Sequence, residues 1–115
     1  MPLLKLETTV ALSEEKRKAL LASLSKITAE TIGKPEEYVM VTANAAAILM
    51  SGKAGEAAFV EVRSIGGLSG DAPKQLSRRI CGLLNDSLGI AQNRVYLNFV
   101  DVEASNWGWK GNTFG

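Results

Sequence analysis

The sequence opens with Met1-Pro2-Leu3-Leu4-Lys5-Leu6, and the interpretation of the whole chain starts from this stretch. Leu4 and Leu6 alternate with their neighbours, so residues 2–8 are predicted to form a strand with one buried face. Proline in second place favours removal of the initiator Met, which leaves a secondary amine at the start of this strand. An amino terminus titrates near pH ~8 in water, and apolar surroundings lower that pKa. The amine is therefore a candidate general base, although many proteins begin with Met-Pro and make no use of it.

The apolar pattern repeats at an offset of 56 residues, the separation of Gly33 and Gly89 (89 − 33). The matching apolar pairs at this offset are Leu4 with Val60, Leu6 with Val62, Leu20 with Leu76, Leu24 with Ile80, Ile27 with Leu83, and Val39 with Val95. Such self-similarity predicts two structurally related halves. We expect one domain over residues 1–115, with pseudo-repeats at about 1–50 and 57–105 and a tail at 106–115.

The first half predicts a strand, a helix and a second strand. Ser13 is placed to cap the helix, with two glutamates in the first turn. Leu20, Leu24 and Ile27 have helical spacing. Gly33 ends the helix, and the second strand is expected at residues 38–42.

The second half repeats this order. Strands are expected at residues 57–64 and 94–102, and the helix between them starts at Ser69 or Asp71 and ends at Gly89. The connection at residues 46–56 is predicted to hold a short edge strand, Ile48-Leu49-Met50.

Two right-handed βαβ units predict an α+β fold, with a four-stranded mixed sheet and both helices on one face. Along the last strand, Val95, Leu97 and Phe99 point one way, whereas Tyr96, Asn98 and Val100 point the other way and are not a typical solvent-facing set. Because the helices cover one face alone, we expect subunits to cover the other, in a homo-oligomer whose closed ring would also protect the strand edges.

Composition excludes several classes of protein. The net charge of +1 gives no electrostatic case for binding nucleic acid or an anionic membrane. The absence of histidine removes His-based triads and most zinc sites, and the single cysteine, Cys81, excludes an internal disulfide and is expected in the core. Residues 1–30 lack the apolar core of a signal peptide, and no apolar run is long enough to span a bilayer. We expect a soluble cytoplasmic protein.

Three stretches could carry chemistry. Lys34 follows the first helix, where a cation also offsets the helix dipole. Ser64-Ile65-Gly66-Gly67 lies between a strand and a helix, where backbone N–H groups can bind an anion, but it also fits an ordinary turn and is no nucleotide-binding motif. Tyr96 and Asn98 share one face of the last strand, as site residues or as satisfied edge residues.

The tail concentrates both tryptophans, Trp107 and Trp109, in a Gly-rich stretch. Left free it would expose a large apolar area. It is expected either to pack on its own core or to dock on a groove, in the second case as a short strand against a neighbouring subunit.

Taken together, these stretches resemble the macrophage migration inhibitory factor family of the tautomerase superfamily. The resemblance covers the whole chain, and its strength lies in the order and spacing of stretches that are individually weak. These are Met1-Pro2, Gly33-Lys34-Pro35, Ser64-Ile65-Gly66, Cys81-Gly82-Leu83-Leu84, Arg94-Val95-Tyr96-Leu97-Asn98, and Gly108-Trp109 with Thr113-Phe114.

The resemblance implies a homotrimer in which three sheets form a central barrel with the helices outside, and a site between subunits. It implies that Pro2 is the proton-shuttling base, and that Lys34 and the backbone N–H of Ile65 bind the carboxylate and oxygen of the substrate. Tyr96 and Asn98 would come from the adjacent subunit.

The resemblance also implies that Trp109 walls the pocket. The implied reaction is keto–enol tautomerisation of a small aromatic α-keto acid such as phenylpyruvate, without cofactor or metal. Residues 57–60 replace the Cys-x-x-Cys of animal relatives, so thiol–oxidoreductase activity is not expected. Trp107 stands where relatives often carry a smaller residue, which would narrow the pocket.

Two alternatives remain open at this point. One is a cytokine-like protein that binds a receptor and has a vestigial pocket; the family includes proteins that leave cells without a signal peptide. The other is a catalytically idle trimeric scaffold, which predicts a blocked amino terminus or a retained Met1.

Overall fold

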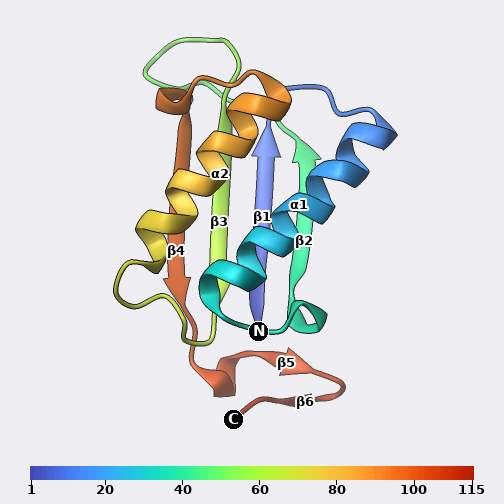
Figure 1. Cartoon of the computed structure of the whole chain (residues 1–115), viewed down its shortest axis with the longest axis vertical. Coiled ribbons are helices and arrows are strands. Elements are labelled where there is room, and N and C mark those ends of the chain that lie inside the picture. The colour runs from blue at the N-terminus through green and yellow to red at the C-terminus, as the bar shows by residue number, and fades with distance from the viewer.

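Strand β1 (Pro2–Thr8) lies inside a four-stranded sheet of order β2-β1-β3-β4 (Figure 1). Strand β2 (Met40–Ala45) runs parallel to β1, β3 (Ala58–Ser64) runs antiparallel to β1, and β4 (Val95–Asp101) runs parallel to β3. This computed structural model describes all of residues 1–115. The sheet is mixed, as predicted, and β2 and β4 are its edges.

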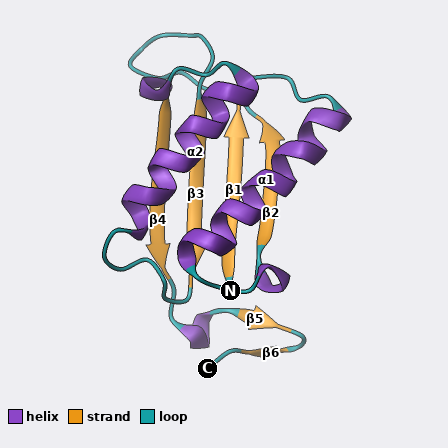
Figure 2. Ribbon diagram, viewed as in Figure 1, coloured by secondary structure: helices purple, strands orange, loops and turns teal.

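Helices α1 (Glu14–Ile32) and α2 (Ala72–Leu88) both lie on one face of the sheet (Figure 2), which confirms the predicted fold class. The Ser13 side chain caps α1 by accepting a backbone hydrogen bond from its first turn. Both helices end at a glycine in the left-handed conformation, with φ of 78° at Gly33 and 70° at Gly89, where residues with a side chain are disfavoured. The predicted ends of both helices are confirmed.

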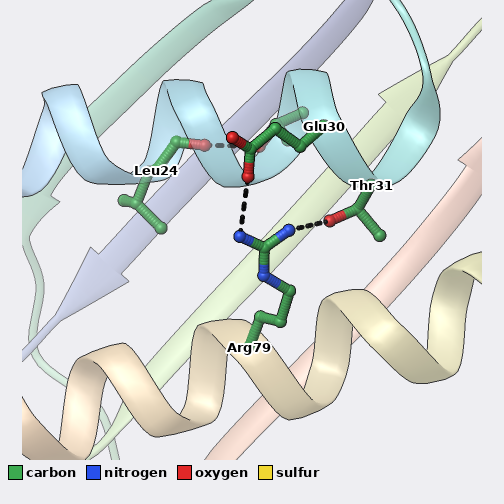
Figure 3. A network of polar contacts seen from close by, with 5 residues as sticks. Leu24, Glu30, Thr31 and Arg79 are labelled. Atoms are coloured by element: carbon green, nitrogen blue, oxygen red, sulfur yellow. Dashed lines mark hydrogen bonds and ion pairs between the residues drawn. The ribbon is translucent and has the colours of Figure 1, made fainter.

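The two helices are joined by one polar cluster (Figure 3). Arg79 of α2 donates hydrogen bonds to Glu30 Oε1 and Thr31 Oγ1 of α1, each 2.9 Å long. The hydrogen bond and charge of Arg79 hold the pKa of the Glu30 carboxyl below its usual value. Within α1, the buried Thr28 hydroxyl donates to the Leu24 carbonyl oxygen at 2.7 Å, which satisfies a polar group that faces the core.

The core fills the space between the helices and the covered face of the sheet. Its fully buried side chains come from both halves of the chain: Leu4, Leu6, Leu24, Val60, Val62, Leu76, Ile80, Leu84 and Ile90. Cys81 belongs to the same cluster, as predicted, and burial raises the pKa of its thiol. These contacts fix β1 firmly and therefore fix the position of the amino terminus.

The second face of the sheet is open in the single chain. Strand register places Thr42, Lys5, Glu61 and Asn98 in one polar row across this face. The neighbouring row contains Met40, Leu3, Arg63 and Val100. The alternation along β4 is confirmed, but the central strands also bring charged side chains to this face, which the sequence pattern did not predict.

The connection at residues 46–56 contains no edge strand, so the prediction of one at Ile48-Leu49-Met50 is wrong. A single bridge pairs Met50 with Lys53 around a tight turn in which Ser51 and Gly52 have positive φ. The turn folds the chain back on itself, and the Arg94 guanidinium donates to the carbonyls of Met50, Lys53, Gly55 and Glu56 around it.

Two predicted strands start later than expected. Residues 36–38 form a short 3₁₀ helix, so β2 begins at Met40 rather than at Tyr38. Likewise residues 92–94 form a 3₁₀ turn before β4. In both places the first turn after Pro35 or Ala91 closes locally before the chain extends.

The tail folds into a small hairpin after a 3₁₀ turn at residues 104–106. Strands β5 (Gly108–Trp109) and β6 (Asn112–Thr113) pair with each other and not with the main sheet. Figure 1 places this hairpin beyond the end of the sheet at which β1 begins. The division of the chain into pseudo-repeats at about 1–50 and 57–105 stays a prediction. No helix is long and apolar enough to cross a membrane.

Candidate functional site

A cavity of about 710 Å³ lies at the end of the sheet where β1 and β2 begin and β3 and β4 end. Its lining residues come from those strand ends, from the turn before β2 and from the tail: Met1, Pro2, Leu3, Glu37, Tyr38, Val39, Met40, Arg63, Val102, Asn106, Trp107, Gly108, Trp109 and Phe114. This volume suits a small organic ligand, and most of the lining is apolar, as in typical ligand pockets.

The amino terminus opens on this cavity. The Pro2 side chain is fully buried, and β1 pairs Pro2 with Ser64 of β3. Burial, and secondarily the charge of Lys34, lower the pKa of the Met1 amine. Lys34 follows Gly33, the residue that ends α1, and is half-buried. It donates its backbone N–H to the Ala29 carbonyl at 3.1 Å. Lys34 and the amino terminus are thus close enough to interact electrostatically, although Lys34 does not line the cavity.

The loop after β3 holds the predicted N–H donor. The Ser64 hydroxyl donates to the Gly66 carbonyl at 2.6 Å, and the Gly66 N–H donates to Asp101 Oδ1 at 3.1 Å. These bonds leave the Ile65 N–H without an acceptor in the chain. Gly67 has a positive φ of 79° and packs directly on Ile32, so no side chain fits there. Hydrogen bonds and packing therefore hold the loop on both sides of the free Ile65 N–H, although Ile65 does not line the cavity. A free backbone N–H can bind an oxyanion.

Tyr96 and Asn98 are not brought together with Pro2 within one chain. Tyr96 is in register with Phe59, and Phe59 is in register with Glu7, which lies five residues along β1 from Pro2. At ~3.3 Å per residue, Tyr96 and Pro2 therefore lie roughly 17 Å apart along the strand direction. The side chain of Tyr96 is 67% exposed. Asn98 borders a second, shallower cavity against the start of α2.

The tail closes the cavity with aromatic rings. Trp109 stacks on Phe114 with ring centroids 5.5 Å apart, and the Lys110 ammonium lies 5.6 Å from the Trp109 ring centroid. The Phe114 N–H also donates to the Trp107 carbonyl at 3.2 Å, a bond that closes the tail on itself. The cavity contains the predicted Pro2 and Trp109. Sequence analysis missed Tyr38 and Arg63 as lining residues, and their only sequence signal was proximity to strand ends.

No group of three or more cysteine, aspartate or glutamate residues is arranged to hold a metal ion. The cavity itself offers an amine with a lowered pKa and the Arg63 guanidinium, and the Lys34 ammonium lies close enough to affect that amine. The free N–H of Ile65 belongs to the loop after β3 and does not line the cavity. These groups can move a proton and stabilise negative charge on oxygen.

Two βαβ units with the amino terminus at a terminal cavity match the fold of solved macrophage migration inhibitory factor homologues, which is the tautomerase superfamily fold. The sequence model of the family described as "Macrophage migration inhibitory factor (MIF)" matches residues 1–115. This chain belongs to the macrophage migration inhibitory factor family, as its sequence motifs predicted. Membership supports a tautomerase activity in general, or a cytokine-like role.

Relatives and solved structures agree with this assignment. A macrophage migration inhibitory factor homolog from Trichuris trichiura is 39% identical over 115 residues, covering 99% of this chain and 100% of the homolog. The crystal structure of a homologue from Prochlorococcus marinus has a TM-score of 0.94 at 38% identity, covering 98% of this chain and 99% of that one. A similar protein from Entamoeba histolytica also gives 0.94, at 34% identity and 98% coverage of both chains.

Proposed function

We propose that this protein is a cofactor-independent keto–enol tautomerase of small aromatic α-keto acids such as phenylpyruvate, with Pro2 as general base. The observation that carries the proposal is the position of the amino terminus, which opens on an apolar cavity where burial and Lys34 lower the pKa of the Met1 amine. Removal of Met1 transfers the terminal amine to Pro2, one residue deeper, where the same two causes act.

The proposed reaction moves one proton. The unprotonated Pro2 nitrogen takes a proton from the carbon next to the keto group, and the electrons of that C–H bond form the C=C bond of the enolate. Negative charge then develops on the keto oxygen. In this proposal Lys34 and the Ile65 N–H stabilise this oxygen and the substrate carboxylate. Support comes from the effect of Lys34 on the terminal amine and from the lack of an acceptor for the Ile65 N–H within the chain. Return of the proton from Pro2 to the oxygen gives the enol and restores the base.

Trp109 forms the aromatic wall against which the substrate ring would pack in this proposal. Tyr96 and Asn98 can contribute only from a neighbouring subunit, because strand register holds them far from Pro2 of their own chain. We therefore propose a homotrimer in which the open sheet faces form a central barrel. Its test is the mass in solution by sedimentation equilibrium: three chains support the assembly, and a stable monomer contradicts it.

Activity of correctly processed protein tests the base. Intact mass first establishes that Met1 is absent, and the initial rate of phenylpyruvate tautomerisation is then compared with that of Pro2→Gly, which keeps a free amine but loses the ring. General-base catalysis is typically worth about 10²–10⁴-fold, and a loss of that order is expected. Equal rates for both proteins, or no turnover by processed wild-type protein, would count against the proposal.

A second candidate is a cytokine-like protein that binds a receptor. The observation in its favour is Leu49, which is 69% exposed on a loop that Arg94 anchors. Receptor binding that survives Pro2→Gly while turnover is lost would show that the two roles are separate. The cytoplasmic location stays a prediction.

A further inference from the structure

Arg63 is the only lysine or arginine side chain that lines the cavity. It is the penultimate residue of β3 and is in register with Leu3, the neighbour of Pro2. It lies on the open face of the sheet, whereas Lys34 follows α1 in the helix layer. The cavity at the amino terminus therefore has Arg63 on its wall and Lys34 nearby, and these two cations come from different layers of the fold.

The guanidinium of Arg63 makes one hydrogen bond within the chain, and its other donors have no acceptor there. Its Nε–H donates to Glu61 Oε1 at 3.0 Å, and the side chain remains 46% exposed. Its terminal Nη1 and Nη2 groups have no acceptor in the chain. Arg79 and Arg94 differ, because both donate their terminal nitrogens to oxygens of the fold. Within the single chain, Arg63 thus presents two terminal nitrogens without an acceptor on the cavity wall.

Such a pair matches a carboxylate, which guanidinium binds through two parallel hydrogen bonds. In the proposed reaction, the carboxylate next to the keto group is bound by Lys34 and the Ile65 N–H. Arg63 then has no partner in a substrate with one negative charge. A second anionic group on the substrate would supply that partner.

We propose that Arg63 is a specificity-determining residue and that the cavity prefers an aryl α-keto acid bearing a second carboxylate on its ring. This inference rests on the proposed function for the placement of the first carboxylate. Glu61 orients Arg63 through its Nε–H and partly offsets its charge, which weakens but does not block anion binding.

Binding of ligands that cannot enolise tests the inference apart from turnover. Isothermal titration of processed protein compares 3-phenylpropionate with 3-(4-carboxyphenyl)propionate. We expect the second to bind about tenfold more tightly, as suits one bidentate pair in a partly exposed site, and Arg63→Gln to abolish this preference. Arg78→Gln removes the same charge from an exposed position on α2 and should keep the preference. Glu61→Gln keeps an oxygen acceptor for Nε and should increase it.

Equal affinity of the wild-type protein for both ligands would overturn the inference, and so would an equal loss of affinity for both in Arg63→Gln, since Arg63 would then hold the first carboxylate. Circular dichroism of each variant checks that it is folded. An Arg63-dependent preference in a protein that turns over no keto acid would support the inference and refute the proposed function. Turnover of phenylpyruvate without a preference for the dicarboxylate ligand would support the proposed function and refute the inference.

Discussion

Trp109 and Phe114 stack with ring centroids 5.5 Å apart and planes within 10° of each other, and both rings line the cavity that contains Pro2. The hairpin of β5 and β6 brings them together, because Trp109 is paired with Asn112 across the turn. The aromatic wall is therefore built from residues close in sequence, and it forms without any contribution from the main sheet.

Loss of the Trp109 ring should weaken substrate binding. Trp109→Ala removes the stacked wall and is expected to raise KM for phenylpyruvate about tenfold, whereas Trp109→Phe retains an aromatic partner for Phe114 and should stay within about threefold of wild type. Steady-state kinetics measure both. A Trp109→Ala enzyme with unchanged KM would show that the ring does not contact substrate.

Arg94 should control the stability of the loop at residues 50–56. Its guanidinium donates to the carbonyls of Met50, Lys53, Gly55 and Glu56 at 2.9–3.4 Å. A lysine cannot reach all four, so Arg94→Lys is expected to lower the free energy of unfolding by about 1–3 kcal/mol and to speed tryptic cleavage after Lys53. Denaturant unfolding and limited proteolysis measure these effects. The exposed Arg78→Lys is the matched control, and equal cleavage rates in the two variants would contradict the assignment.

Cys81 should be an unreactive thiol. Burial raises the pKa of its thiol, so less thiolate is present at pH 8 than in an exposed cysteine, and access is blocked as well. Ellman's reagent is expected to label the native protein at least about 100-fold more slowly than the protein unfolded in guanidinium chloride. Equally fast labelling of native protein would place Cys81 outside the core.

If each site is shared between two subunits, two inactive variants should restore activity when they are combined in one oligomer. Pro2→Gly and Tyr96→Ala each remove one side of the proposed site, and in one chain these residues are roughly 17 Å apart along the strand direction. Mixed oligomers, refolded together from the two inactive variants, should regain activity because some interfaces carry Pro2 from one chain and Tyr96 from the other. Activity no higher than the mean of the two parents would argue that Tyr96 has no role across an interface.

Local chemistry made much of this fold predictable. The capping Ser13, the terminal glycines Gly33 and Gly89, and the alternation along β1 and β4 each follow from the residue itself and its nearest neighbours. Residues 48–50 form no edge strand: Met50 pairs with Lys53 across a turn, and Arg94, 44 residues beyond Met50, also donates to the Met50 carbonyl. No local pattern contains that information.

The candidate site divides in the same way. Short local motifs in the sequence were enough to predict three candidate site residues: Pro2, Lys34 and Ile65. Arg63 was missed because its importance depends on register: it becomes a cavity residue only when β3 is placed beside β1, opposite Leu3. A charged residue near the end of a strand looks like any solvent-exposed side chain until that pairing is known.

The pKa of the Pro2 amine tests the central claim most directly. Nitrogen chemical shifts of protein labelled with ¹⁵N-proline, followed across pH, should show the amine titrating below the ordinary value near ~8, because burial and Lys34 disfavour its charged form. A base acts when deprotonated, so kcat/KM should rise with pH through this same pKa, and Lys34→Gln should move the amine pKa upward. An amine that titrates at or above the ordinary value, or a rate profile that ignores its titration, would contradict the assignment of Pro2 as the base.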